Sequence, residues 1–253
     1  VLDSSDETYK LLTEDRRIIN PLGIFIDAEG NKYVADPKAK AVFVFNREDT
    51  MTAIMLRDLG IYPMDVVVRG DKMYVVDMNK MQIVVVNKSD GSEILRFGKK
   101  GSEPGQFKYI GGMAVDEDEN IYITDKITAS ITIFDKDGIF VSKFGKPTTG
   151  VHDFVRPKGI DVDREGRMWI VDAATGVAKI YDQEQRLLLY FGLPDDGAAG
   201  ALYFPIGIRI DYDNIEHFRS YAVDGAEIEA IILIANQFGK NKISVYALGT
   251  FPQ

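Results

Sequence analysis

Apolar and polar residues alternate along this chain in short segments that repeat at a nearly even spacing. A typical repeat begins with an alternating segment such as Ile160-Asp161-Val162, passes through a turn rich in Asp, Glu, Gly and Asn, and continues into a second apolar segment. Short segments of β-branched and aromatic residues bounded by turn residues are typical of β-strands. The pattern therefore predicts an all-β protein.

Five copies of this repeat can be counted. They start at Pro21, Pro63, Ile110, Pro157 and Pro205. A third strand follows in each copy, as in "SITIF" at 130–134, and a fourth ends three copies with Phe-Gly, as in "FVSKFG" at 140–145. Several strands are apolar on consecutive residues, which indicates burial on both faces. Four-stranded units with a period of about 40–50 residues are typical of β-propeller blades. We predict one propeller domain over residues 1–253.

The fifth copy has three strands and no Phe-Gly strand before the sequence ends. Residues 8–12, "TYKLL", stand ahead of the first copy as "AIMLR" at 53–57 stands ahead of the second. We therefore expect the N-terminal strand to complete the last blade and to hide its edge.

The shared pattern resembles the NHL repeat, and in particular the bacterial extracytoplasmic NHL proteins. It has the form P-x-G-I-x-x-D-x-x-G-x-x-Y-V-x-D with a later G-x-x-x-G-x-F, as in "GSEPGQF" at 101–107, and covers residues 21–248. The resemblance implies a propeller that usually has six blades, against the five counted here. It also implies a location in the periplasm or at the cell surface. An envelope or multihaem cytochrome complex as the partner rests on the resemblance alone.

Composition narrows the class of protein. The formal net charge of −9 argues against nucleic acid, because proteins that bind phosphates usually carry clustered Lys and Arg. No apolar segment approaches the roughly 20 residues that cross a bilayer, and the longest is "AIILIA" at 230–235. The chain has no cysteine, so we expect no disulfide, thiol catalysis or zinc–thiolate site in it. A lipid anchor or signal peptide upstream of Val1 is left open.

Candidate catalytic residues are few. The sequence has only two histidines, His152 and His217, which fall in different loops, so it cannot supply the three-histidine metal site of NHL-like lyases. No G-x-S-x-G motif of a serine hydrolase is present either. The second strand ends on an acid or amide in every copy: Asp36, Asp77, Asp125, Asp172 and Asn236. A ring of carboxylates could bind calcium, as in lactonases on related propellers. Alternatively, each side chain could accept hydrogen bonds from backbone N–H groups of the following turn. We favour this structural role because it explains why the residue recurs in every copy.

Two further positions follow the same logic. Four of the five copies close the first strand with an aspartate, for which we expect the same turn-forming role: Asp27, Asp116, Asp163 and Asp211, with Arg69 as the exception. Trp169 stands where three sister copies have tyrosine, and we interpret it as a packing variant between blades.

The fifth copy departs most from the repeat, because 25 residues separate Asp211 from Asn236 where 9 separate Asp163 from Asp172. Residues 212–230 thus form an acidic insertion, and loops longer than their siblings are often functional. It predicts either an extended hairpin with a solvated face or a docking loop for a basic partner. The candidate partner-binding residues are Asp213, Glu216, Phe218, Arg219, Tyr221, Asp224, Glu227 and Glu229.

A modest basic loop, 98–109, is the second candidate surface. It carries Lys99, Lys100 and Lys108. It is not a phosphate-binding glycine loop of the Walker type, because no Gly-Lys-Ser/Thr follows and no helix begins there.

We expect a non-enzymatic scaffold, without a cofactor, that presents propeller-face loops to a partner protein in an extracytoplasmic complex. The alternative is a calcium-dependent hydrolase or lactonase with carboxylate ligands at the propeller axis. The fold alone cannot choose between them, since propellers host both binding and catalysis.

Overall fold

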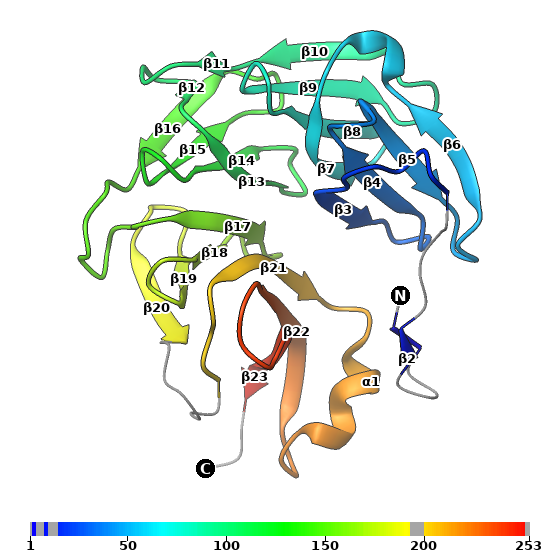
Figure 1. Ribbon diagram of the computed structural model, residues 1–253. Coiled ribbons are helices and arrows are strands. Elements are labelled where there is room, and N and C mark those ends of the chain that lie inside the picture. Colours follow the sequence, from blue (N-terminus) through cyan, green and yellow to red (C-terminus); the bar gives the residue numbers. More distant parts are fainter. Residues whose placement is uncertain (1, 4–7, 10–14, 193–199, 251–253) are drawn as a thin grey trace. The chain divides into compact units, whose positions relative to one another are not determined.

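Antiparallel sheets make up nearly all of the regular structure (Figure 1). The computed structural model describes residues 2–3, 8–9, 15–192 and 200–250. The chain divides into two units, Val1–Gly98 and Lys99–Gln253. No helix in the described ranges is long and apolar enough to span a membrane.

The first unit contains two four-stranded sheets whose strands follow each other in chain order. The first sheet consists of β3 (Gly23–Ile26), β4 (Lys32–Asp36), β5 (Ala41–Phe45) and β6 (Met51–Met55). The second consists of β7 (Pro63–Arg69), β8 (Lys72–Asp77), β9 (Gln82–Asn87) and β10 (Glu93–Phe97). The remaining elements are the short strands β1 (Leu2–Asp3) and β2 (Thr8–Tyr9) and the 3-10 helix η1 (Arg57–Leu59).

The second unit contains three larger sheets. Two of them are four-stranded. One consists of β13 (Ile110–Val115), β14 (Ile121–Asp125), β15 (Ser130–Phe134) and β16 (Phe140–Phe144). The other consists of β17 (Pro157–Val162), β18 (Met168–Asp172), β19 (Val177–Tyr181) and β20 (Leu187–Gly192). The third has three strands: β21 (Pro205–Asp211), β22 (Glu227–Asn236) and β23 (Ile243–Thr250). The remaining elements are β11 (Lys99–Lys100), β12 (Gln106–Phe107), α1 (Ile215–Phe218) and the 3-10 helix η2 (Arg219–Tyr221).

These sheets are the five blades that the repeat predicted. We call the first strand of each blade its inner strand. Each predicted start is the first residue of an inner strand or lies two residues before it. The predicted closure of the fifth blade by residues 8–12 is not confirmed. Thr8 and Tyr9 pair with Asp3 and Leu2, and residues 10–12 lie outside the described residues. Among the described strands, the fifth sheet ends at β23. The assignment of one domain to the whole chain stays a prediction.

Burial on both faces explains why the strands are apolar on consecutive residues. In β18, Met168 and Ile170 pack into a cluster with the third blade, whereas Trp169 and Val171 pack into a cluster with the fifth. Successive side chains of a strand point to opposite faces of its sheet. The alternation that usually separates core from solvent therefore separates one inter-blade core from the next.

The residue that ends the second strand of each blade is buried and bonded to the backbone. Asp36 Oδ2 accepts hydrogen bonds from the backbone N–H groups of Ile19 and Asn20, at 2.6 and 2.7 Å. Its Oδ1 accepts from Lys38 and Ala39, both at 2.9 Å. Burial acts to raise the pKa of Asp36, but these backbone hydrogen bonds outweigh it and hold the pKa below the ordinary value.

Asp125 repeats this arrangement in the second unit. Its carboxylate accepts from the backbone N–H groups of Lys108 and Tyr109, which precede the first strand, and of Ile127, in the turn after the second strand. The predicted role in the following turn is confirmed. The loop before the first strand supplies a second set of donors, so one carboxylate joins two segments that are distant in sequence.

The fifth blade uses an amide because its turn offers acceptors. Asn236 Oδ1 accepts from the backbone N–H of Tyr203 at 3.1 Å. Its Nδ2 donates to the carbonyl oxygen of Asn241 at 3.1 Å and to Ser244 Oγ at 2.9 Å. A carboxylate has no N–H group to donate to the carbonyl oxygen of Asn241, which accounts for the departure from aspartate in this blade.

Exchanging the acid and the amide should destabilise both blades. In Asp36→Asn an NH₂ group faces backbone N–H donors, and we expect the free energy of unfolding to fall by about 2 kcal/mol or more, because buried donors lose their acceptor. In Asn236→Asp a carboxylate oxygen faces a carbonyl oxygen, with a loss of similar size. Chemical denaturation followed by circular dichroism measures both, and unchanged stability in either variant would contradict the hydrogen-bonding role.

Candidate functional site

Five side chains from three successive blades of the second unit gather where the inner strands begin. We call them the cation–aromatic cluster: Tyr109, Lys126, Arg156, Lys158 and Phe204. Lys126 Nζ lies 3.7 Å from the centroid of the Tyr109 ring. Lys158 Nζ and Arg156 Cζ lie 5.0 and 5.9 Å from the centroid of the Phe204 ring. These distances are in the range of cation–π attraction.

Glycines on the inner strands allow the three blades to approach closely enough to form this cluster. A Cβ atom on Gly112 of β13 would lie 2.8 Å from the carbonyl oxygen of Lys158 on β17. A Cβ on Gly159 of β17 would lie 2.6 Å from the Cα of Gly207 on β21. Thr124 Oγ1 also donates to the Lys158 carbonyl, at 2.6 Å. Backbone therefore meets backbone between neighbouring blades, and the residues beside these contacts are brought together.

The cluster concentrates positive charge in an acidic chain. Burial lowers the pKa of Lys126, and the neighbouring charges of Lys158 and Arg156 lower it further, against the opposing effect of Asp125. Burial also lowers the pKa of Lys158, and Arg156 contributes to that effect. Within the described residues, none of these three cations forms an ion pair with a carboxylate. Among the residues that the structure describes, the charge of these three groups is therefore not matched by a paired carboxylate.

Apolar side chains border the cluster. The Phe238 ring lies 5.4 Å from that of Phe204, centroid to centroid, and Phe238 is 57% exposed. Ile127, next to Lys126 in the chain, is 58% exposed. The surface thus combines cations with exposed apolar contacts.

The basic loop predicted from the sequence reaches this surface only at its end. Lys108 is exposed and immediately precedes Tyr109, and its backbone N–H is bonded to Asp125. Lys99 and Lys100 are exposed on β11, which pairs with β12. In the described part of the chain, no hydrogen bond or ion pair connects these two lysines to the cluster.

The acidic insertion lies at the other end of the inner strand, since it follows Asp211 at the end of β21 and Phe204 precedes that strand. It contains α1 and η2, so it is only in part the extended hairpin that was one expectation: residues 227–230 continue as strand and pair with β23. Arg219 is paired with Glu216 at 2.7 Å. Phe218 is half-buried, and the exposed candidates are Asp213, Glu216, Arg219, Tyr221, Asp224, Glu227 and Glu229. The two predicted surfaces are therefore separate.

Sequence comparison of the copies missed Lys126, Arg156 and Lys158, although a signal existed. Aligned by blade, Arg156 falls where the neighbouring copies have Tyr109 and Phe204. Only the close approach of the inner strands shows that these positions share one surface.

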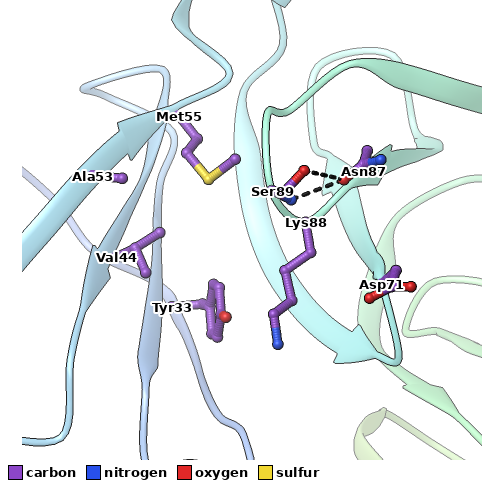
Figure 2. A pocket seen from close by; sticks show the side chains of 8 residues that line it. All are labelled: Tyr33, Val44, Ala53, Met55, Asp71, Asn87, Lys88 and Ser89. Carbon is purple, nitrogen blue, oxygen red and sulfur yellow. Dashed lines mark hydrogen bonds between the residues drawn. The ribbon is translucent and has the colours of Figure 1, made fainter.

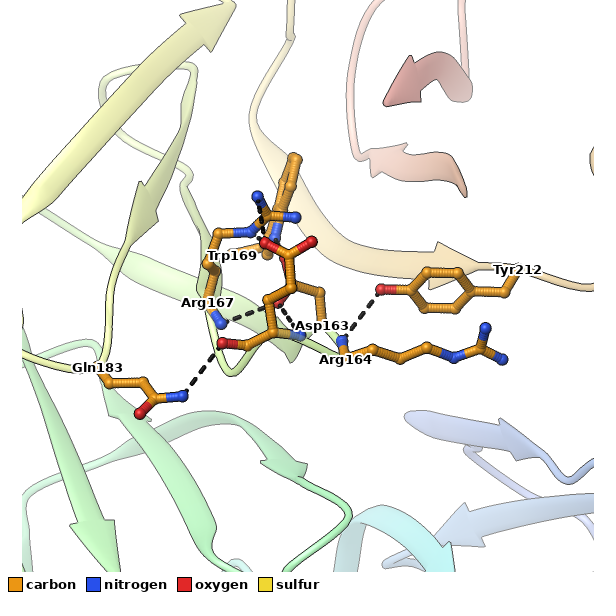
Figure 3. Close-up of polar contacts among 7 residues, drawn as sticks. Asp163, Arg164, Arg167, Trp169, Gln183 and Tyr212 are labelled. Atoms are coloured by element: carbon orange, nitrogen blue, oxygen red, sulfur yellow. Dashed lines mark hydrogen bonds and ion pairs between the residues drawn. The ribbon is translucent and has the colours of Figure 1, made fainter. Parts of the chain in front are cut away.

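The aspartates that close the first strands are turn residues. Tyr33 OH donates to Asp27 Oδ2 at 3.0 Å. In the same way, Trp169 Nε1 donates to Asp163 Oδ2 at 2.8 Å, as Figure 3 shows. Trp169 packs between blades and also makes the hydrogen bond of the tyrosine that it replaces. In the described ranges, no three His, Asp or Glu side chains gather in a way that could hold a metal ion.

A pocket of about 460 Å³ lies between the two blades of the first unit (Figure 2). It is lined by Tyr33, Val44, Ala53, Met55, Asp71, Asn87, Lys88 and Ser89. Lys88 Nζ lies 3.4 Å from Asp27 Oδ2 and 3.9 Å from Glu29 Oε2, so the one lysine in the lining is already paired with the protein's own carboxylates.

Comparison with known proteins agrees with this architecture. A family model described as a 6-bladed beta-propeller (DUF5128) matches residues 117–195. A catalytically inactive virginiamycin B lyase from Staphylococcus aureus, solved with quinupristin, is 18% identical with a TM-score of 0.58, over 93% of this chain and 72% of that one. A gluconolactonase from Xanthomonas campestris is 14% identical with a TM-score of 0.59, over 85% and 69%. No curated protein sequence matches significantly. The protein is a β-propeller, and at these identities the likeness extends to the fold alone.

The two glycines at the contact between β17 and β21 should differ in their tolerance of a side chain. Gly159→Ala places a methyl group against backbone, so we expect a loss of about 1–3 kcal/mol in the free energy of unfolding. Gly207→Ala is the matched control, because its nearest neighbour would be Ala235 Cβ at 3.8 Å, an ordinary contact. Thermal melting should separate the two variants, and equal melting temperatures would show that the blades are not held at backbone contact.

Proposed function

We propose that this chain is a non-enzymatic protein-binding scaffold of the NHL type, which presents the loops at one end of its inner strands to a partner protein. The single observation that carries the proposal is the cation–aromatic cluster. Arginine and aromatic side chains are enriched where proteins bind one another.

The support of the cluster suits a binding surface. Buried residues such as Asp125 and Asp172 bind the loop before the first strand and the turn after the second to one carboxylate. Side chains on these loops are therefore presented by a rigid scaffold, the usual arrangement of binding loops. A partner that docks there meets a surface that is largely preorganised, which lowers the entropic cost of association.

Assignment to NHL-type propellers is supported by the repeat pattern, whose prolines, glycines and aspartates occupy equivalent positions in successive blades. The extracytoplasmic location, and an envelope or multihaem cytochrome complex as partner, follow from the same resemblance. The calcium-dependent hydrolase or lactonase is the alternative. It requires carboxylates with free oxygens, whereas Asp36, Asp125 and Asp172 accept hydrogen bonds from backbone N–H groups on both oxygens. In Asp77, Oδ1 accepts two such bonds, and only its buried Oδ2 is left without a partner among the described residues.

Capture of the partner should depend on the cluster. We expect the tagged wild-type chain to retain a specific protein from its native source, and Lys126→Met/Lys158→Met to lose at least about 90% of it, because two central contacts cost roughly tenfold or more in affinity. Quantitative mass spectrometry of the retained proteins measures the difference.

The matched control is Lys136→Met/Lys143→Met, which removes the same charge from the β15–β16 turn and β16. It should retain the partner as the wild type does. If both double variants retain the same proteins in the same amounts, the cluster is not the binding surface and the proposal is wrong. Stoichiometric calcium that supports lactone hydrolysis would instead favour the alternative.

A further inference from the structure

We infer that the cation–aromatic cluster binds an acidic polypeptide segment that carries an apolar side chain beside its carboxylates. The inference rests on the proposed function and specifies the chemistry of the partner.

The first step is the unneutralised charge. Lys126, Arg156 and Lys158 come from two blades, and among the described residues none has a carboxylate partner. The two lysines are half-buried, so their ammonium groups have lost part of their hydration and repel each other. A carboxylate bound between them would relieve this repulsion, and the guanidinium of Arg156 suits bidentate pairing with a carboxylate.

The second step concerns the rings, and it favours protein over single-stranded nucleic acid. Proteins that bind single strands stack bases on open aromatic faces. Here Lys126 lies over the ring of Tyr109, and Lys158 and Arg156 lie over that of Phe204. A cation therefore lies against each of these two rings, which leaves less open aromatic surface on them for stacking bases. The net charge of −9 also repels a polyanion more strongly than it repels a short segment with a few carboxylates.

The third step is the apolar border. Phe238 is more than half exposed and extends the aromatic surface of Phe204, and Ile127, which follows Lys126 in the chain, is also more than half exposed. Apolar area next to unpaired cations suits a segment in which a Leu or Phe follows an acidic residue. A free inorganic anion would leave these side chains in water, so the expected ligand is a peptide.

Fluorescence anisotropy with a labelled peptide tests this inference. The probe is Gly-Asp-Glu-Leu-Glu-Asp-Phe-Gly, and the comparison peptide has lysine at each acidic position. We expect the acidic peptide to bind the wild type and the Lys136→Met/Lys143→Met control equally. Binding to Lys126→Met/Lys158→Met should be at least about tenfold weaker. It should also weaken when NaCl rises from about 0.05 to about 0.5 M, because salt screens partly exposed charges.

The same measurements can overturn the inference. It is wrong if the acidic peptide does not bind, or if the cluster variant binds it as tightly as the control, with thermal melting confirming that both are folded. It is also wrong if a labelled oligouridine binds more tightly than the peptide and loses its binding in the cluster variant. Sedimentation that shows cluster-dependent self-association would assign the surface to a second copy instead. Should partner capture depend on the cluster while acidic peptides fail to bind, only this inference falls and the proposed function stands.

Discussion

Hydrogen bonds from backbone N–H groups to one buried side chain at the end of each second strand hold the rest of this structure in place. Each aspartate accepts from the loop before the first strand and from the turn after the second, as Asp36 does with donors at 2.6–2.9 Å. Asn236 accepts from the loop and donates to the turn. Charge-assisted hydrogen bonds are stronger than neutral ones, and a buried donor left without its acceptor is costly. A hydrogen-bonding side chain is therefore found at this position in every blade. The loops that carry the candidate site are held rigid by the same hydrogen bonds.

This interaction changes how the recurring acidic residues are interpreted. A repeated aspartate on propeller strands could be a metal ligand, but in Asp36, Asp125 and Asp172 both carboxylate oxygens accept hydrogen bonds from the backbone, and in Asp77 one oxygen does. The fifth blade supports the same interpretation. Asn236 replaces aspartate where the turn presents a carbonyl oxygen, so hydrogen-bond complementarity selects the residue. The positions that distinguish one blade from another are then the ones available for binding.

The cation–aromatic cluster occupies such positions. Its positive charge contrasts with the negative net charge of the chain. A protein with a net charge of −9 gains long-range repulsion from other acidic surfaces, yet Lys126, Arg156 and Lys158 remain unpaired in the described structure. Keeping three half-buried or clustered cations together costs folding free energy. The cluster is consistent with a surface whose stabilising charges arrive with a partner.

Strand composition, blade boundaries and burial on both faces could be predicted from the sequence, because they follow from residue periodicity and turn chemistry within about 15 residues of chain. The structural role of Asp36 and its equivalents was also accessible, since it recurs in every copy. The short helix α1 in the insertion was not foreseen, because an insertion has no sister segment for comparison. Nor was the cluster: Lys126 and Lys158 belong to different blades, and periodicity says nothing about the distance between them. That distance depends on Gly112 and Gly159, where the missing side chains let neighbouring strands meet backbone to backbone.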